Sequence, residues 1–193
     1  DGYRFASALG HSISPCFPSL TALVPKGYKL VPDGYKADMK CHIDRNIELS
    51  DMGKALCGNS LKNIGLHLEV NGGEVQEIDG DIDFTDGGIE GPAGFSISRN
   101  AVKALINGSK VKVSMDLKPG VPEEEFAART NALWKEVLAD SRSAGKPIRQ
   151  TVKILLGKLL PWELIPGFMK CHPEIITGTK GRETLKIKAL VNA

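Results

Sequence analysis

Two kinds of hydrophobic periodicity divide this chain near residue 120. Before that point, apolar and polar residues alternate along several short stretches, which is typical of strands with one buried face. In residues 63–70 (NIGLHLEV) every second residue is apolar, and His67 falls among the positions expected to face solvent. The following Asn71-Gly72-Gly73 tolerates positive φ angles, so residues 74–78 are predicted to return as a hairpin partner.

Three further stretches belong to the predicted β-rich part. Residues 36–43 (KADMKCHI) and 110–117 (KVKVSMDL) repeat the alternation and are predicted to be half-buried strands. Residues 11–25 contain three prolines, which predicts an edge strand or an irregular one. A helix is predicted to open at Pro92 and to end near Asn107-Gly108, because proline suits the first helical position and glycine suits the exit.

After Pro119-Gly120 the periodicity becomes helical. Three glutamates follow Pro122 and complement the dipole of a first helix, and residues 146–160 predict a second helix that Pro161 ends. Residues 162–170 predict a short third turn. The buried face of the first helix is predicted to hold Phe126, Thr130, Leu133, Trp134, Val137 and Leu138, and that of the second Ile148, Val152, Leu155, Leu156 and Leu159. Trp162, like Trp134, is expected to make core or inter-lobe contacts.

These elements predict an α+β fold. Residues 1–120 are expected to form a β-barrel-like or sandwich lobe with one internal helix, and residues 121–193 a small helical lobe. The start, residues 1–10, is interpreted as a stub of a flanking helix, and Ile187, Leu190 and Val191 mark an unfinished helix at the other end. We therefore expect a domain cut from a longer protein.

Composition excludes several classes of protein. The 193 residues suffice for one core or for two small lobes, and 41% hydrophobic with 25% charged residues is ordinary for a folded domain. The net charge of +2 argues against a nucleic-acid binder that depends on phosphate contacts. No apolar run reaches the roughly 20 residues that a membrane-spanning helix needs, so no membrane partner is expected.

The cysteines do not predict a disulfide framework or a metal site. Cys16, Cys41, Cys57 and Cys171 are far apart in the sequence and form no C-x-x-C pair, which favours free thiols in a reducing cytoplasm. The pairs Cys41-His42 and Cys171-His172 lack the spacing of zinc ligands, because adjacent residues of a strand point to opposite faces. No metal is predicted from the sequence.

Residues 79–96 (DGDIDFTDGGIEGPAGFS) resemble a calcium loop at first sight. Asp79, Asp81, Asp83 and Glu90 take loop positions 1, 3, 5 and 12, but Phe84 occupies position 6, where the loop requires glycine. The same residues predict a strand that places Asp81 and Asp83 on one solvated face. We therefore favour the strand.

A phosphate cradle is the second interpretation of this stretch. A strand, a glycine-rich turn and a helix that starts at Pro92 would expose free N–H groups to an anion. However, the stretch lacks both the G-x-G-x-x-G spacing and the Lys-Ser/Thr of a P-loop, and Glu90 would repel a phosphate. Glycines that serve a turn and a close helix approach are favoured over a nucleotide site.

Four segments taken in order resemble a known arrangement: residues 8–25 (ALGHSISPCFPSLTALVP), 58–69 (GNSLKNIGLHLE), 81–99 (DIDFTDGGIEGPAGFSISR), and VKVSMDLKP followed by KILLGKLLPWELIP. Together they resemble the insert domain of a bacterial family of NAD(P)/FAD-dependent oxidoreductases, with members labelled aminoacetone oxidase-like or 3-dehydro-bile-acid reductase-like flavoproteins. The resemblance is loosest over residues 26–50.

The family motif is close to F-T-H-x-G-x-S-G-P-A. Six residues of this chain match it, and two depart from it, with Asp86 in place of histidine and Glu90 in place of serine. The matching residues are Phe84, Thr85, Gly88, Gly91, Pro92 and Ala93. The resemblance implies that the glycines and the proline shape the turn and the helix start, while the two acidic departures prevent direct transfer of any catalytic role.

The resemblance implies a cytoplasmic parent enzyme whose Rossmann-type FAD domain is split around this domain. The chain would then be a substrate-cleft cap, with its own FAD-binding domain and a small-molecule substrate as partners, and with NAD(P)H as an allowed electron donor. Alone it would bind no FAD and catalyse nothing. The residues expected at the cleft are Thr85, Asp86, Gly88, Gly91, Pro92, Pro15, Pro18 and Ser19. The main alternative is a free-standing ligand- or protein-binding β-barrel module, followed by a purely structural interaction domain.

Overall fold

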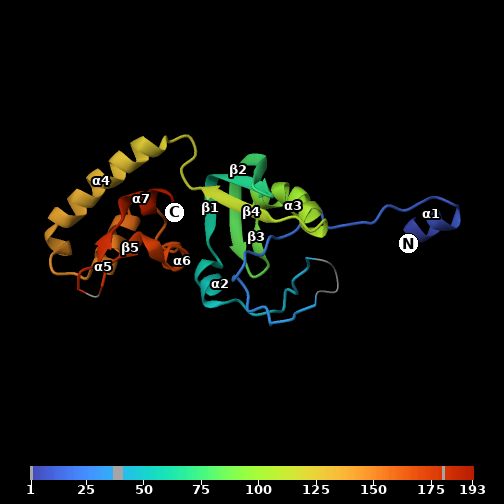
Figure 1. The fold of residues 1–193 in the computed structure, drawn as a ribbon, viewed down its shortest axis with the longest axis horizontal. Helices are drawn as coiled ribbons and strands as arrows, with labels where there is room; N and C mark the ends of the chain where they lie inside the picture. The colour runs from blue at the N-terminus through green and yellow to red at the C-terminus, as the bar shows by residue number, and fades with distance from the viewer. Residues whose placement is uncertain (1, 37–40, 180) are drawn as a thin grey trace.

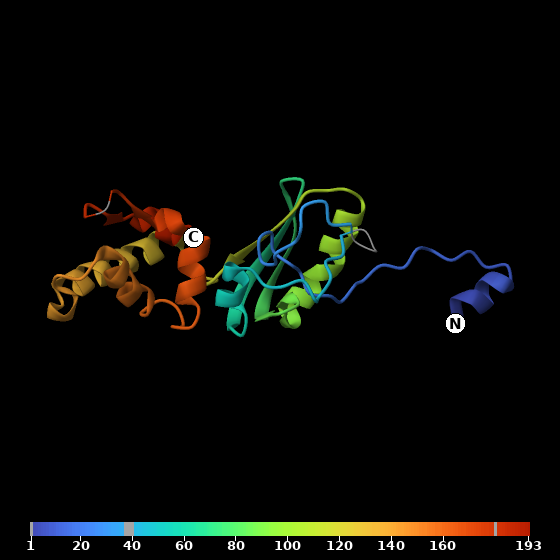
Figure 2. The same cartoon turned by 90° about the horizontal axis from the view of Figure 1, so that it is seen from below.

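The computed structural model describes residues 2–36, 41–179 and 181–193. The molecule is elongated, with a helical part at one end, a curled antiparallel sheet in the middle and a short helix at the far end of an extended segment (Figures 1 and 2). This arrangement confirms the predicted α+β class with a barrel-like sheet followed by helices. No helix among the described residues is both long and apolar enough to cross a membrane.

The first half of the chain forms the sheet and its helices. In chain order the elements are α1 (Gly2–Ala8), α2 (Asp51–Leu56), β1 (Ser60–Val70), β2 (Gly73–Thr85), β3 (Gly88–Glu90), α3 (Gly91–Ile106) and β4 (Val111–Asp116). The sheet order is β3-β2-β1-β4, and each pair of neighbours is antiparallel. The β1–β2 hairpin confirms the reversal predicted at Asn71-Gly72, where both residues have positive φ.

Helices dominate the second half. The elements are α4 (Glu123–Ala139), η1 (Ser141–Ser143), α5 (Ile148–Leu156), α6 (Ile165–Cys171), η2 (Pro173–Ile175), the short strands β5 (Ile176–Thr177) and β6 (Thr184–Leu185), and α7 (Ile187–Val191). The amphipathic patterns of α4 and α5 confirm the two predicted helices, and α6 is the predicted third turn. β5 and β6 pair with each other as a separate small sheet.

One face of the large sheet is apolar and packs on α3. On β1, Ile64, Leu66 and Leu68 are almost completely buried, and from β2 the side chain of Ile82 joins them. At Gly80 an added Cβ would lie 3.2 Å from the Cβ of Ala93, so glycine allows β2 and α3 to approach closely. The opposite face carries the polar residues of the alternating pattern, among them His67.

A second apolar cluster lies among the helices and meets the first. Val152, Leu155 and Leu156 of α5 form its centre, and Leu117 and Leu160 pack against both clusters. Leu164 comes from the helical half of the chain but is buried in the cluster of the sheet. Helix α6 also contacts α2, where Gly167 lies against Leu56. The two halves are thus held together by continuous apolar packing.

Four details of the sequence prediction were wrong. The predicted strand at 36–43 falls partly on residues 37–40, which lie outside the described residues, and its remaining positions are loop, with Cys41 at a left-handed φ of 68°. Leu138 is 56% exposed although it was assigned to a buried face, and Trp162 is 60% exposed. Helix α5 ends at Leu156 rather than at Pro161, because Gly157 weakens helical continuation. In contrast, the irregular alternative predicted for residues 11–25 is confirmed, with one bridge between Leu23 and Ile89.

Candidate functional site

The turn that joins β2 to β3 is held by its own polar groups. The hydroxyl of Thr85 accepts a hydrogen bond from the Gly87 N–H (3.0 Å) and donates one to the Gly88 carbonyl (3.3 Å). The phenol of Tyr28, which is completely buried, donates to the Thr85 carbonyl at 2.8 Å. Burial raises the pKa of Tyr28, so it stays a neutral donor at physiological pH. Thr85 therefore has a structural role in the turn.

Gly88 and Gly91 are required where backbones approach closely. Both have positive φ, of 126° and 87°. A Cβ at Gly88 would overlap the Leu23 carbonyl, and a Cβ at Gly91 would lie 2.9 Å from the Ile82 Cα. Glycine at these two positions thus lets α3 begin directly against β2 and lets residues 23–24 run beside β3.

The start of α3 does not fit a dinucleotide phosphate. Gly91, Ala93 and Gly94 are buried against the protein's own strands, and Pro92 has no N–H to offer. Glu90 immediately precedes the helix and makes no capping hydrogen bond, and its negative charge would repel a phosphate at the helix start. The residues of this turn therefore do not fit the pyrophosphate of FAD or NAD(P)H.

Asp86 is paired with a residue that sequence reasoning missed. Arg45 donates from Nη2 to Oδ1 of Asp86 (2.7 Å) and from Nε to Oδ2 (3.2 Å). These hydrogen bonds lower the pKa of Asp86, and both side chains are more than half exposed. The buried ammonium of Lys29 donates to the carbonyls of Arg45 (2.7 Å) and Ile47 (3.2 Å). The loop around Arg45 is thus fastened to the turn.

The second predicted segment meets α3 through a buried serine. Ser98 is completely buried, its Oγ accepts from the Thr21 N–H (3.3 Å) and lies 3.4 Å from the Ser19 carbonyl. The structure therefore brings Ser19 to α3 and Leu23 to β3. Pro15 is exposed and takes no part in these contacts, so the predicted segment is only partly assembled with the turn.

A large open groove of about 1710 Å³ lies beside this assembly. Pro18 and Gly87 line it, but Asp86, Gly91 and Pro92 are not among its lining residues. Its apolar wall comes from the segment before α2, from α3 and from the edge strand β4: Leu23, Val24, Phe95, Val102, Leu105, Val113 and Met115. Its basic side chains are Lys26, Lys29, Lys36, His42 and Arg45, and Glu90 is the acidic side chain in its lining. These features suit an amphipathic small molecule with an anionic group.

The sequence offered little signal for Lys29, Arg45 and Ser98. Lys29 and Arg45 lie in residues 26–50, where neither periodicity nor the family resemblance was clear. No sequence pattern singles out Ser98, and only the packing of residues 19–21 on α3 reveals its role. Asp86 was the one signal in the sequence for a basic partner such as Arg45, since a charge beside a turn requires a partner or solvent.

A family model matches residues 46–170, under the description "HI0933-like protein barrel and H2TH domain". The matched region runs from the loop that holds Asn46 to α6, and it includes the whole large sheet, α3, α4 and α5. It does not include residues 8–25, one of the four segments of the resemblance. No curated protein matches the chain.

Proposed function

We propose a function for this chain on the premise that it belongs to the family of the HI0933-like protein barrel and H2TH domain, a family of FAD-dependent oxidoreductase-like proteins. The chain acts as the substrate-cleft cap of a FAD-dependent oxidoreductase. Within the family, the F-T-x-x-G-x-x-G-P-A pattern of residues 84–93 favours the aminoacetone oxidase-like or 3-dehydro-bile-acid reductase-like group.

The family match carries this proposal. It covers the sheet and the first helices of the second half as one unit, which is the combination of barrel and helical domain that the family is named for. The buried start of α3 supports a division of labour, because the described residues at this helix start offer no phosphate cradle. FAD is held by a separate FAD-binding domain of the same protein, supplies the redox chemistry there, and accepts electrons from NAD(P)H or from the substrate.

The groove is the part of the chain that faces the substrate. Its apolar wall orients a small molecule, and Arg45 and Lys26 at its basic side attract an anionic group. Asp86 positions Arg45 rather than contacting the substrate. In a cytoplasmic enzyme of this kind, closure of the groove against the FAD-binding domain excludes water from the reacting atoms.

Helix α1 supplies a docking surface for the FAD-binding domain. Helix α1 has no buried residue, and Tyr3, Phe5 and Leu9 are 66%, 71% and 79% exposed. Figures 1 and 2 show α1 at the end of an extended segment, away from the sheet. Exposed aromatic side chains on this short helix, and Leu9 directly after it, gain free energy when a partner covers them.

The experiment compares this chain with the complete gene product after each is purified. We expect the complete protein to be yellow from bound FAD and this chain to be colourless, even after FAD is added. A structure of the complete protein with FAD then shows whether the groove lies beside the isoalloxazine ring. Two colourless proteins, or a groove far from the isoalloxazine ring, would overturn the cap assignment. Colourless proteins would favour the free-standing binding module, whose ligand would occupy the same groove.

A further inference from the structure

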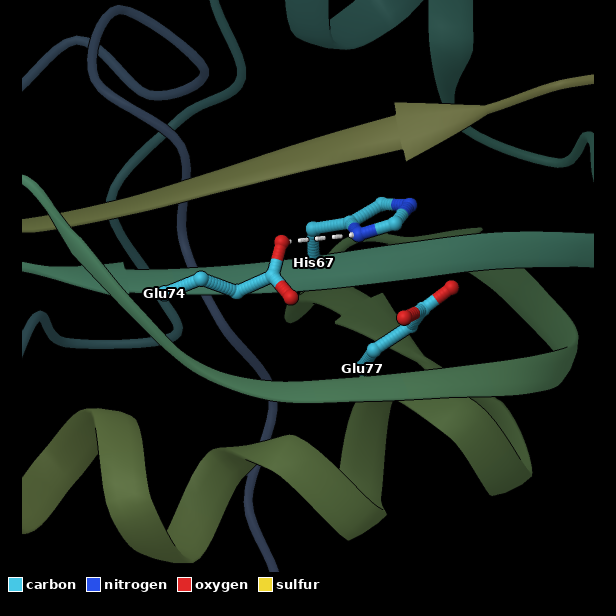
Figure 3. Close-up of side chains that lie close together, drawn as sticks. All are labelled: His67, Glu74 and Glu77. Atoms are coloured by element: carbon cyan, nitrogen blue, oxygen red, sulfur yellow. Dashed lines mark hydrogen bonds and ion pairs between the residues drawn. The ribbon is translucent and has the colours of Figure 1, made fainter.

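The polar face of the β1–β2 hairpin carries a cluster that the proposed function does not use. His67 on β1 pairs directly with Glu77 on β2, so both side chains project from the same face. This is the face opposite to α3, because Gln76, the neighbour of Glu77, bonds to Asn100 of α3. Figure 3 shows His67, Glu74 and Glu77 pointing toward one another.

A β-bulge brings Glu74 into this cluster. The register runs from Leu68↔Gln76 to Glu69↔Glu74, so Val75 is an extra residue on β2. In a regular strand, Glu74 and Glu77 would point to opposite faces, because the side-chain period is two. The bulge returns Glu74 to the face of His67, and its carboxylate lies 3.2 Å from Nδ1 of His67. The sequence does not reveal this cluster, because regular strand periodicity would place Glu74 and Glu77 on opposite faces.

We propose that His67, Glu74 and Glu77 bind a divalent transition-metal ion of the zinc type. Each residue offers one ligand atom, and these atoms all lie within 4.8 Å of one another. Ligands of a tetrahedral zinc ion lie about 3.4 Å apart when each bond is about 2.1 Å long. The His67–Glu74 pair already has that spacing, and the exposed side chain of Glu77 closes the remainder by rotation about its χ angles.

The donor set selects the kind of metal. Zinc accepts both imidazole nitrogen and carboxylate oxygen as ligands, whereas calcium and magnesium prefer oxygen ligands alone. A metal at this position joins the two strands across the bulge. It leaves a fourth coordination position for water.

The surroundings favour a cation and leave room for it. Lys112, the nearest basic residue on the neighbouring strand, is paired with Glu69 at 2.9 Å. Asp79 and Asp116 lie on the same face, beside Gly65. A Cβ at Gly65 would lie 3.4 Å from Oδ1 of Asp79 and 3.6 Å from Nε2 of His67, so glycine keeps the space beside the imidazole open. The face thus combines net negative charge with access for water.

The test is a calorimetric titration of the reduced chain with Zn²⁺. The variants are Glu77→Gln and His67→Gln, and Asp83→Asn is the matched control because Asp83 lies on the same face of β2, six residues from Glu77. We expect the affinity of one site to fall about tenfold or more in E77Q and H67Q and to stay unchanged in D83N. An excess of Mg²⁺ should leave the zinc isotherm as it is.

Zinc held by the four free cysteines is common to all variants and cancels in the comparison. A second measurement is the melting temperature, which zinc should raise in the parent chain and in D83N but not in E77Q. Identical isotherms for the parent chain and E77Q would overturn the proposal, and His67 and Glu74 would then form only an ion pair. Circular dichroism of each variant confirms that the hairpin is folded.

Discussion

At the scale of single residues, the acidic substitutions at positions 86 and 90 acquire a physical reason. Asp86 forms two hydrogen bonds with Arg45, and Glu90 adds further attraction for the same guanidinium. The acidic residues thus hold a basic side chain at the edge of the groove. A histidine at 86, as in the family motif, would not provide this bidentate partner for arginine.

The first prediction concerns the pH dependence of this ion pair. Arg45 holds the pKa of Asp86 below its usual value of 3.8, so folding favours the ionised carboxylate. Its stabilisation is fully present above that usual value and is lost as the pH falls through the lower, folded-state pKa. We expect Asp86→Asn to lower the melting temperature by a constant small amount above about pH 5, and by progressively less below about pH 4.

Arg45→Gln provides the control for that prediction. If the two charges act on each other, the double variant should lose no more stability than either single variant. High salt should reduce the difference between Asp86→Asn and the parent chain, because both side chains are exposed. A difference that persists unchanged at pH 3 or in high salt would show that Asp86 stabilises the fold by a route other than charge.

At the scale of elements, the turn before α3 joins two segments that are distant in sequence. Leu23 and Ile89 exchange two backbone hydrogen bonds, of 3.0 and 2.8 Å, between residues 23–24 and strand β3. That pairing requires glycine at position 88, whose Cα faces the Leu23 carbonyl. Gly88 therefore determines whether the irregular N-terminal segment can add to the sheet.

The second prediction is that Gly88→Ala is more destabilising than the same change at Gly120. Both glycines have positive φ, but a Cβ at Gly120 would meet no atom within 4 Å. Gly120→Ala should cost about 1 kcal/mol from backbone strain alone. Gly88→Ala should cost at least about 1 kcal/mol more in urea unfolding, because the new methyl overlaps the Leu23 carbonyl.

Hydrogen exchange gives the matching structural measurement for Gly88→Ala. The amides of Leu23 and Ile89 should lose protection in this variant and keep it in Gly120→Ala. Equal destabilisation by the two substitutions would mean that residues 23–24 shift at little cost, and that the bridge to β3 is not a fixed part of the fold.

How much of this could be predicted from the sequence depends on the separation of the interacting residues. The β1–β2 hairpin and helices α3, α4 and α5 follow from local patterns, because turn residues, caps and periodicity lie within each element. The contact of Arg45 with Asp86 spans 41 residues, and that of Thr21 with Ser98 spans 77. Both start from loops without periodicity, so no local pattern indicates them.

The errors within elements have the same origin. Leu138 fits the helical stripe of α4 but is 56% exposed, whereas Val137 beside it is buried. The ring of Trp162 covers Gly157, where a side chain would collide with it, yet most of its surface stays in solvent. Periodicity predicts which residues share a face, whereas burial depends on which neighbours cover that face.

At the scale of the whole molecule, the contact between α2 and α6 joins the helical half to the sheet. Gly167 of α6 packs on Leu56 and on the backbone of Ala55, and Lys170 donates to the Asp51 carbonyl at 3.1 Å. Beside this contact lies a second cavity of about 740 Å³, lined by residues of both halves such as Phe84 and Leu160. Close approach at this glycine therefore helps to fix the orientation of the two halves, beside the apolar packing that joins them.

The third prediction is that Gly167→Val separates the two halves. The new side chain would collide with Leu56, and such overpacking costs about 1–3 kcal/mol in the free energy of unfolding. We expect an increased radius of gyration in small-angle scattering, together with broader or two-step urea unfolding.

The rescue variant is Leu56→Ala with Gly167→Val, since shortening Leu56 makes room for valine. Its loss of stability should be smaller than the sum of the two single losses. Strict additivity, or an unchanged radius in Gly167→Val, would show that α6 tolerates the larger side chain and that the halves are held by the apolar clusters alone.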